Sequence, residues 1–388
     1  MSIAIRWCSP CHLDVRTRAA WSELGQRARH PSPFLLPQFI VPAAHWLTPG
    51  RPPRIALFER LGRGGRELVG VGCFTAEQPG LYLPVHHWRG YRTRHSFRTG
   101  LLVTPQDGDA VAEALLAAIR RGDGAPRSHA ILFGNVLEHD DGLAALRRVA
   151  QADGGSWHEV RRFARPVLHV PEGLDATEAM PRKVLKNLRR HRRRLEELGP
   201  VRARVLQGHD VQPAVAERFL QLERSGWKGA KGSALRCSQA GTGFFQDMVA
   251  QFSQIGAAVF VEILLGDQVI GSTSYFLVGS TLSAFKIGWH PQYAKHSPGC
   301  LTKLAALEAL SGTWPGVDKF DSNAQEKSWL AQMLPHTETV VAGMLATTRW
   351  GTTALAATRL LRPLVSRLGA NPLSDRPSQP DWPPPAAA

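Results

Sequence analysis

The stretch from Ala257 to Leu310 constrains the fold more than any other part of the chain. Three runs rich in β-branched and aromatic residues, 257–265, 268–278 and 282–289, are separated by short Gly-Asp and Gly-Ser turns. Tight turns between such runs predict an antiparallel meander. After the third run, Ser297-Pro298-Gly299 precedes leucines and alanines at helical spacing, so a helix is expected next. The strands therefore lead into the N-terminus of a helix.

The N-terminus of this helix is predicted to bind an anion. The first turn of a helix has backbone N–H groups without intrahelical partners and carries the positive end of the helix dipole. Pro298 suits the first turn because it has no N–H, and Gly299 is expected to let an anion approach the backbone without a Cβ in the way. The residues expected to hold the anion are Lys295, His296, Ser297, Pro298, Gly299 and Cys300.

Two motifs in this region resemble a known family. FKIGWHPQYAKHSPGCL (285–301) is similar to the K-I-G-Y…Y-A…S-P-G-x-L-L pattern of the FemAB-like/CelD-like branch of the GNAT acyltransferases. LERSGWKGAKGSAL (222–235) resembles the L-E…G-W-K-G…G-T-A-L segment of the same branch. The resemblance runs from about Phe163 to Leu334 and is looser over 1–162. It implies an acyl-CoA donor, with acetyl-CoA as the leading candidate, whose pyrophosphate lies at the helix N-terminus, and it implies no metal.

The order of expected elements suggests two similar units. Helices, a hairpin and strands are expected before residue 170, and a related order recurs after residue 200. Together with the resemblance, this predicts an α/β fold of two tandem GNAT-like units, each a mixed sheet flanked by helices. We expect a degenerate N-terminal unit at 1–165 and an acyltransferase unit with the acyl-CoA site at 166–368. The Pro-rich segment 369–388 has too little apolar surface to fold and is expected to be a disordered tail.

Acyl transfer requires a base for the incoming nucleophile and a donor for the thioester carbonyl. Glu223, near the end of a helix expected over 213–225, is the predicted base; the alternative is a surface carboxylate paired with a nearby arginine. Lys286 lies in an apolar strand, where its charge is costly unless it reaches water or an anion, so it is expected to face the donor groove. Asp321 resembles a family aspartate at a strand end, although the following sequence departs from the family pattern. Trp227 and Lys228, from the second motif, are expected to contact the substrate.

Basic charge is concentrated in one predicted helix. The net charge is +15, and residues 182–194 hold eight Lys and Arg and no acidic residue. The helix has an apolar stripe formed by Val184, Leu185, Leu188, Leu195 and Leu198. Its basic face is either a solvated surface or a clamp for an anionic partner. The candidates are the phosphates of acyl-CoA, an acyl carrier protein, an anionic lipid and tRNA.

Several other classes of protein lack support in the sequence. There is no G-x-S-x-G, H-E-x-x-H or Walker A motif. Cys8 and Cys11 form a C-x-x-C pair, but too few residues precede them for a thioredoxin motif and no second cysteine pair completes a zinc site. No run approaches the ~18 apolar residues of a membrane span, and the N-terminus has no secretory apolar region. A cytoplasmic location is expected, with a peripheral place at the inner membrane as the alternative.

The function expected from the resemblance is acyl-CoA-dependent N- or O-acylation of a sugar or of a cell-envelope or exopolysaccharide precursor. Two alternatives remain open. One is aminoacyl transfer from charged tRNA, as in FemAB-type enzymes. The other is a non-catalytic envelope-assembly protein with a vestigial donor site.

Overall fold

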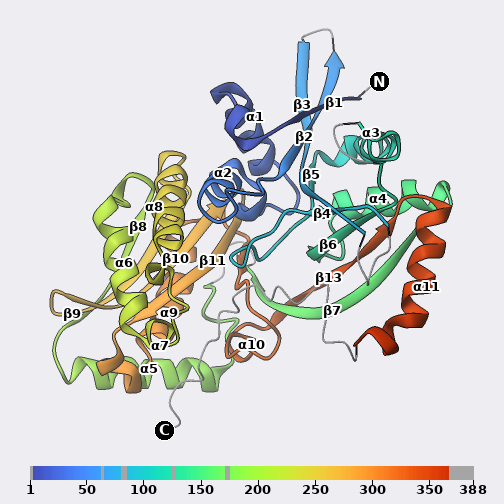
Figure 1. Ribbon diagram of the computed structural model, residues 1–388. Helices are drawn as coiled ribbons and strands as arrows, with labels where there is room; N and C mark the ends of the chain where they lie inside the picture. The colour runs from blue at the N-terminus through green and yellow to red at the C-terminus, as the bar shows by residue number, and fades with distance from the viewer. Residues whose placement is uncertain (1–2, 63–64, 80–84, 124–126, 171–174, 367–388) are drawn as a thin grey trace. The chain divides into compact units, whose positions relative to one another are not determined.

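The computed structural model describes residues 3–366, apart from 63–64, 80–84, 124–126 and 171–174 (Figure 1). The expected tail at 369–388 therefore lies outside the described residues. The chain divides into two compact units. One unit holds the described residues up to Phe163 and those from Thr339 onward, and the other runs from Ala164 to Glu338; His45–Leu47 group with the second unit.

The first unit is a mixed sheet with helices. Its strand order is β1-β2-β3-β4-β6-β13, with β5 also paired to β3. The β4–β6 pair is parallel, and the other pairs are antiparallel. Helices α3 and α4 pack on the sheet through a core that includes Phe58, Phe74, Leu115 and Leu146. The elements are β1 (Ile3–Cys8), α1 (Val15–Gln26), α2 (Pro37–Trp46), β2 (Arg54–Gly62), β3 (Gly65–Glu77), β4 (His87–Gly90), β5 (Leu101–Val103), α3 (Gly108–Arg121), β6 (Ala130–Leu137), α4 (Asp141–Ala152), β13 (His336–Ala346) and α11 (Arg349–Ser366).

The second unit contains the meander that the sequence predicts. Its strand order is β7-β12-β11-β10-β9-β8, in which only the β11–β12 pair is parallel. The strands are β7 (Ser156–His169), β8 (Val201–Gln207), β9 (Ala258–Leu265), β10 (Gln268–Val278), β11 (Thr281–Trp289) and β12 (Lys319–Asp321). The helices are α5 (Arg182–Glu196), α6 (Pro213–Ser225), α7 (Trp227–Ala230), α8 (Gln239–Gln254), α9 (Pro298–Thr313) and α10 (Leu330–Met333).

Helices cover both faces of the second sheet. Successive side chains of a strand point to opposite faces, and apolar side chains on each face pack against a helix layer. On one face, Phe219 of α6 and Phe245 of α8 contact Phe260 of β9. On the other face, α9 and α5 bury Leu304 and Leu188 in a core with residues such as Val261 and Tyr275. Both faces of the meander are therefore buried.

The predicted α/β fold of two mixed sheets flanked by helices is confirmed, with several local differences. The second unit was expected to extend to residue 368, whereas the residues from Thr339 group with the first unit, where Val340–Ala346 of β13 pair with β6. Leu198 was expected in the apolar stripe of the basic helix. It follows the last helical residue and is 55% exposed, while His191 takes a buried place on that stripe. Among the described residues, no helix is long and apolar enough to cross a membrane.

Candidate active site

The second sheet opens between its two parallel strands. β11 pairs with β12 only over Thr281–Ser283, after which β12 ends at Asp321 while β11 continues to Trp289. Asn323, in the left-handed conformation with φ 50°, donates its side-chain amide to the backbone carbonyl of Ala284 at 2.8 Å. β11 and β12 therefore separate beyond Ala284, and the second half of β11 borders the opening.

A β-bulge lies on β11 at the start of this opening. Ser274 of β10 pairs with Lys286 and the adjacent Tyr275 pairs with Ala284, so Phe285 is the extra residue. Bulges re-aim side chains and are frequent beside active sites. The predicted groove residue Lys286 follows the bulge; it is 6% exposed, with its Nζ 5.3 Å from the centre of the Phe285 ring.

Glu223 and Lys228 form a buried ion pair that connects α6, α7 and β11. The Nζ of Lys228 lies 2.8 Å from Oε1 of Glu223 and donates to the carbonyl of Ile287 on β11 at 3.0 Å. The second carboxylate oxygen of Glu223 accepts from the N–H of Leu235 at 2.9 Å. Glu223 is 3% exposed, so the alternative of a surface carboxylate is wrong.

This arrangement bears directly on the predicted base. Each carboxylate oxygen of Glu223 already accepts one hydrogen bond, and the side chain is buried, so an incoming acceptor would meet only the remaining lone pairs. A role as base would need a route for the acceptor to one of these lone pairs, and exchange of the Lys228 bond is one such route. Close approach to the backbone of α6 explains two glycines of the motifs. A Cβ at Gly288 would lie 2.7 Å from the nitrogen of Glu223, and a Cβ at Gly229 would lie 1.7 Å from the carbonyl of Arg224. Trp227, half-buried beside this pair, has the Nζ of Lys231 5.1 Å from its ring centre.

The N-terminus of α9 holds buried polar atoms without partners. Ser297, the N-cap residue, is in the left-handed conformation with φ 52°, which is costly for a serine. Its hydroxyl and both ring nitrogens of His296 are buried and have no hydrogen-bond partner among the described residues. Burial, followed by the charge of Lys295, lowers the pKa of His296. Buried polar atoms of this kind call for a ligand or water.

Two features predicted for this anion site, free N–H groups in the first turn and access past Gly299, differ in the structure. The N–H groups of Cys300 and Leu301 are not available to a ligand, because both donate to the carbonyl of Ser297. A Cβ at Gly299 would meet Cδ1 of Ile287 at 2.7 Å, so this glycine permits close packing of α9 on β11 rather than the approach of an anion. Lys295 is exposed, and burial raises the pKa of the Cys300 thiol to about 12.

Asp321 lies in a buried cluster that the sequence did not reveal. Its Oδ2 is 3.3 Å from Nη1 of Arg165, and its Oδ1 accepts from the N–H of Asn323 at 2.8 Å. Arg165 also donates to Oδ1 of Asn323 at 3.1 Å. The cluster holds the end of β12 in place. An asparagine just after a strand is a signal for a left-handed turn, but nothing in the sequence connects Arg165 to Asp321.

Lys303 is a second residue that the sequence reading missed. It lies on α9 and is 1% exposed, with its Nζ 4.3 Å from the centre of the Tyr275 ring. Burial lowers its pKa well below the usual value. A lysine within the apolar helix run LTKLAALEAL was the available signal.

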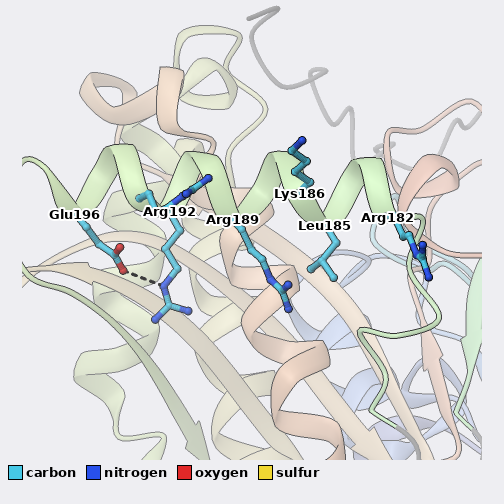
Figure 2. A pocket seen from close by; sticks show the side chains of 7 residues that line it. Arg182, Leu185, Lys186, Arg189, Arg192 and Glu196 are labelled. Atoms are coloured by element: carbon cyan, nitrogen blue, oxygen red, sulfur yellow. Dashed lines mark hydrogen bonds and ion pairs between the residues drawn. The ribbon is translucent and has the colours of Figure 1, made fainter.

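The basic helix α5 lies against α9 and against the 3-10 helix Pro291–His296 that precedes it. Arg192 forms ion pairs with Glu196 at 3.3 Å and Glu308 at 3.9 Å. Figure 2 shows Arg189 and Arg192 on one side of α5 and Lys186 on the other. A hollow of about 690 Å³ follows the helix, lined by Arg182, Leu185, Lys186, Arg189, Arg192, Arg193 and Glu196. No acid other than Glu196 and Glu308 forms an ion pair with an α5 cation in the described part of the chain.

Neither cysteine chemistry nor a metal centre has support from the described residues. No group of three or more His, Cys, Asp or Glu side chains there could hold a metal ion. Cys8 lies on β1, where burial raises its pKa, and Cys11 is exposed with its Sγ 2.9 Å from the hydroxyl of Ser9.

Part of the second unit is similar to a known family. Residues 182–329 match the family model of the acetyltransferase (GNAT) domain. This segment runs from α5 through the meander and α9 to the residues after β12, so it contains the opening and the residues around it. The second unit thus contains a GNAT-type acetyltransferase domain. No curated protein matches the chain at a significant level.

Solved structures show the same fold over nearly the whole chain. FemX is 12% identical, covers 95% of this chain and 100% of its own, and has a TM-score of 0.57. A conserved protein of unknown function from Bacteroides thetaiotaomicron is 10% identical, covers 88% and 99%, and has a TM-score of 0.53. The C-terminal domain of a protein described as a lysylphosphatidylglycerol synthetase from Agrobacterium fabrum is 12% identical, covers 89% and 95%, and has a TM-score of 0.52. At these identities the likeness is one of fold alone.

Proposed function

We propose that the protein transfers an acyl group, with acetyl as the first candidate, from acyl-CoA to an amine or hydroxyl of a sugar or cell-envelope precursor. The observation that carries this proposal is the set of unpartnered, buried polar atoms of His296 and Ser297 at the N-terminus of α9, within the GNAT-type domain. These atoms lie at the helix end where the dipole favours negative charge. The acceptor class follows only from the resemblance to CelD-like proteins.

The residues present fit a phosphate-bearing donor. His296 and Ser297 offer ring nitrogens and a hydroxyl to a phosphate, and the exposed Lys295 adds a positive charge. The donor, when bound, supplies the activated thioester. The acyl arm is proposed to lie along β11 beyond its pairing with β12, where Lys286 follows the bulge.

On the acceptor side, Glu223 is proposed as the base, with Trp227 and Lys228 next to the acceptor and Asp321 at the end of β12. In this proposal the buried Glu223 carboxylate takes the proton by exchanging its bond from Lys228 for the acceptor hydroxyl or amine. The short chain segment α6–α7 is where this exchange would occur, since Lys228 lies on α7 and Glu223 near the end of α6.

The test is calorimetric titration of the full-length protein with CoA and acetyl-CoA, followed by mass spectrometry of acceptor mixtures incubated with protein and acetyl-CoA. Saturable binding and a mass gain of one acetyl group on an amine or hydroxyl acceptor are expected. The matched variants are Ser297→Ala, which removes the orphaned hydroxyl at α9, and Ser225→Ala, which removes a hydroxyl that bonds within its own helix. Equal CoA affinity in both variants, or no CoA binding by the unaltered protein, would contradict the donor site.

A second candidate is aminoacyl transfer from charged tRNA, as the resemblance to FemAB-type enzymes implies. The cations of α5 favour it, because those other than Arg192 form no ion pair among the described residues. Phosphate contacts by Lys and Arg make nucleic-acid binding fall steeply with salt. The test is titration of tRNA at low and at high salt. Binding of tRNA that weakens steeply as salt rises, together with no detectable CoA binding, would replace the first candidate by this one. Binding of neither ligand would favour the third reading, a non-catalytic assembly protein.

A further inference from the structure

One side of α5 carries a straight row of four cations. Arg182, Lys186, Arg189 and Arg193 recur at intervals of three or four residues, so they lie within about 60° of one another around the helix axis. All four residues are exposed, and the buried residues of α5 lie on its opposite side. The row extends about 17 Å along the helix and faces away from the core of the second unit.

The row has no negative partner among the described residues. In that part of the chain Arg192 alone of the α5 cations forms ion pairs, with Glu196 at 3.3 Å and with Glu308 of α9 at 3.9 Å. Like charges three or four residues apart on a helix repel one another, so four successive cations destabilise α5 while nothing binds to them. An anionic partner would remove this repulsion.

A long hollow accompanies the row. It has a volume of about 690 Å³ and is lined by the four row residues together with Leu185, Arg192 and Glu196. Figure 2 shows Lys186 and Arg189 on opposite sides of α5, so cations border the hollow on both sides. Because its lining extends from Arg182 to Glu196, the hollow is about 21 Å long. Its shape and charge suit an elongated polyanion.

Three classes of polyanion carry the charge that this surface needs, and the geometry favours one of them. An acidic α-helix has the same rise of about 1.5 Å per residue as α5, so its carboxylates stay opposite the row over the whole length when the two helices run side by side. The backbone of an RNA helix winds around its own axis and follows a straight row over only part of its length. A lipid surface is a plane, so it would not enter the hollow and would attract Lys183 and Arg194, exposed on another side of α5, as well as the row.

We propose that this face of α5 docks an acidic α-helix of a partner protein, with Glu or Asp residues at the same spacing as the row. The guanidinium groups of Arg182, Arg189 and Arg193 suit carboxylates because each is able to donate two parallel hydrogen bonds. Leu185 offers the partner helix an apolar contact, and Glu196 repels an acid at the other end of the hollow. This inference goes beyond acyl transfer and does not depend on the donor.

The test uses two labelled Ala-rich peptides of about 20 residues, a length at which isolated helices of this composition form. One has four Glu at the spacing of the row, and the other has the same composition with its four Glu spread around the helix. Fluorescence anisotropy with the full-length protein at low salt measures the affinity for each peptide. We expect the patterned peptide to bind at least about tenfold more tightly than the control peptide, and its affinity to fall as salt is added.

Matched double substitutions locate the surface. Arg189→Glu/Arg193→Glu reverses two charges of the row, and Lys183→Glu/Arg194→Glu reverses two exposed charges on another side of the same helix. The first should weaken binding of the patterned peptide at least about tenfold, and the second less than about twofold. Circular dichroism and urea unfolding establish that both variants are folded. If the first is not, Arg189→Gln/Arg193→Gln removes the same charges without adding repulsion and makes the same test.

Equal affinity for the two peptides, binding of neither, or an equal loss in both variants would overturn the acidic-helix partner. The competing occupants are tested with tRNA and with vesicles that contain phosphatidylglycerol. Tighter binding of either one than of the patterned peptide, lost in the row variant and kept in the control variant, would also overturn it and assign the row to that polyanion. None of these probes contains CoA, so failure of the docking surface leaves the acyl-CoA proposal standing, and failure of CoA binding leaves the docking surface standing.

Discussion

Glu223 carries a donor on each of its carboxylate oxygens, and one of these donors, Lys228, also reaches the carbonyl of Ile287 on β11. Three elements thus depend on one ion pair that is almost fully buried. A buried ion pair is costly to break, because removing one partner leaves the other charge without compensation. A structural role of the Glu223–Lys228 pair in the second unit is therefore separate from a catalytic role of Glu223 as a base.

The first prediction separates these roles of Glu223. We expect Glu223→Gln to lower the free energy of unfolding by about 3 kcal/mol, because it leaves the Lys228 charge buried without its partner. Adding Lys228→Met should restore part of this loss, as measured by urea unfolding of both variants. If Glu223→Gln instead keeps the original stability while turnover falls by about 10²–10⁴-fold, the carboxylate acts as the base.

The second prediction concerns Lys303, whose amine is buried over the Tyr275 ring. Burial lowers its pKa well below the usual value, so the folded chain binds fewer protons there than the unfolded chain. The penalty grows as the pH falls below the unfolded pKa of about 10.4. Lys303→Met has a similar length and no amine, and should raise the free energy of unfolding at pH 7 by about 1–3 kcal/mol. A loss of stability would mean that the ring contact outweighs the burial of the amine.

At the scale of elements, α5 and α9 are packed together by side chains of the apolar stripe. Leu188 and Leu195 of α5 are buried with Leu301 and Leu304 of α9. Because His191 lies between the two leucines of α5 in sequence and is buried as well, the packing of α5 places an imidazole beside the 3-10 helix Pro291–His296. The geometry of this contact therefore brings the ring of one element next to the proposed anion site at the start of α9.

The third prediction is the pH dependence of stability without ligand. Burial lowers the pKa of His191 and His296 below the unfolded value of about 6.5, so the unfolded chain binds more protons once the pH falls below that value. Their contribution to stability is present above pH 6.5 and is lost as the pH falls towards the folded pKa values. Urea unfolding at pH 7.5 and pH 5.5 should show a smaller decrease for the His191→Gln/His296→Gln variant than for the unaltered chain. An equal decrease would mean that these histidines do not bind the protons.

At the scale of the whole chain, the C-terminal part of the described structure returns to the first unit. Val340–Ala346 of β13 pair with β6, although the chain between them forms the second unit. β6 is fully buried and pairs with β4 only over Ala130–Leu132, so β13 is its more extensive strand partner. The first unit therefore needs residues that lie far along the sequence.

The fourth prediction tests this dependence by ending the chain after Glu338. Loss of β13 exposes one edge of the apolar strand β6, and exposed apolar edges open and aggregate readily. Amide hydrogen exchange should show loss of protection in β6, whereas β9 and β10, paired within Ala164–Glu338, should retain most of theirs. Unchanged protection of β6 would show that the first unit is stable without β13.

Local patterns in the sequence determined much of the second unit. Local signals predicted the turns of the meander, the helix that begins near Pro298 and the helix over 213–225. The structure has β9, β10, β11, α6 and α9 at nearly the expected positions. Alternation, glycine turns and helix starts depend on neighbouring residues, which is why they can be read along the chain. The residues around the N-terminus of α9, the proposed donor site, could be located in sequence for the same reason.

Only the tertiary structure decided which of these residues meet. Lys228 with Ile287, Arg165 with Asp321, His191 with His296 and β13 with β6 are contacts between segments brought together by packing. The role of Gly299 changed from phosphate access to close packing on Ile287, because a missing Cβ has a meaning only when its surroundings are known. Local signals fix where strands and helices form, whereas the burial of side chains between distant elements decides which charges are paired and which polar atoms remain for a ligand.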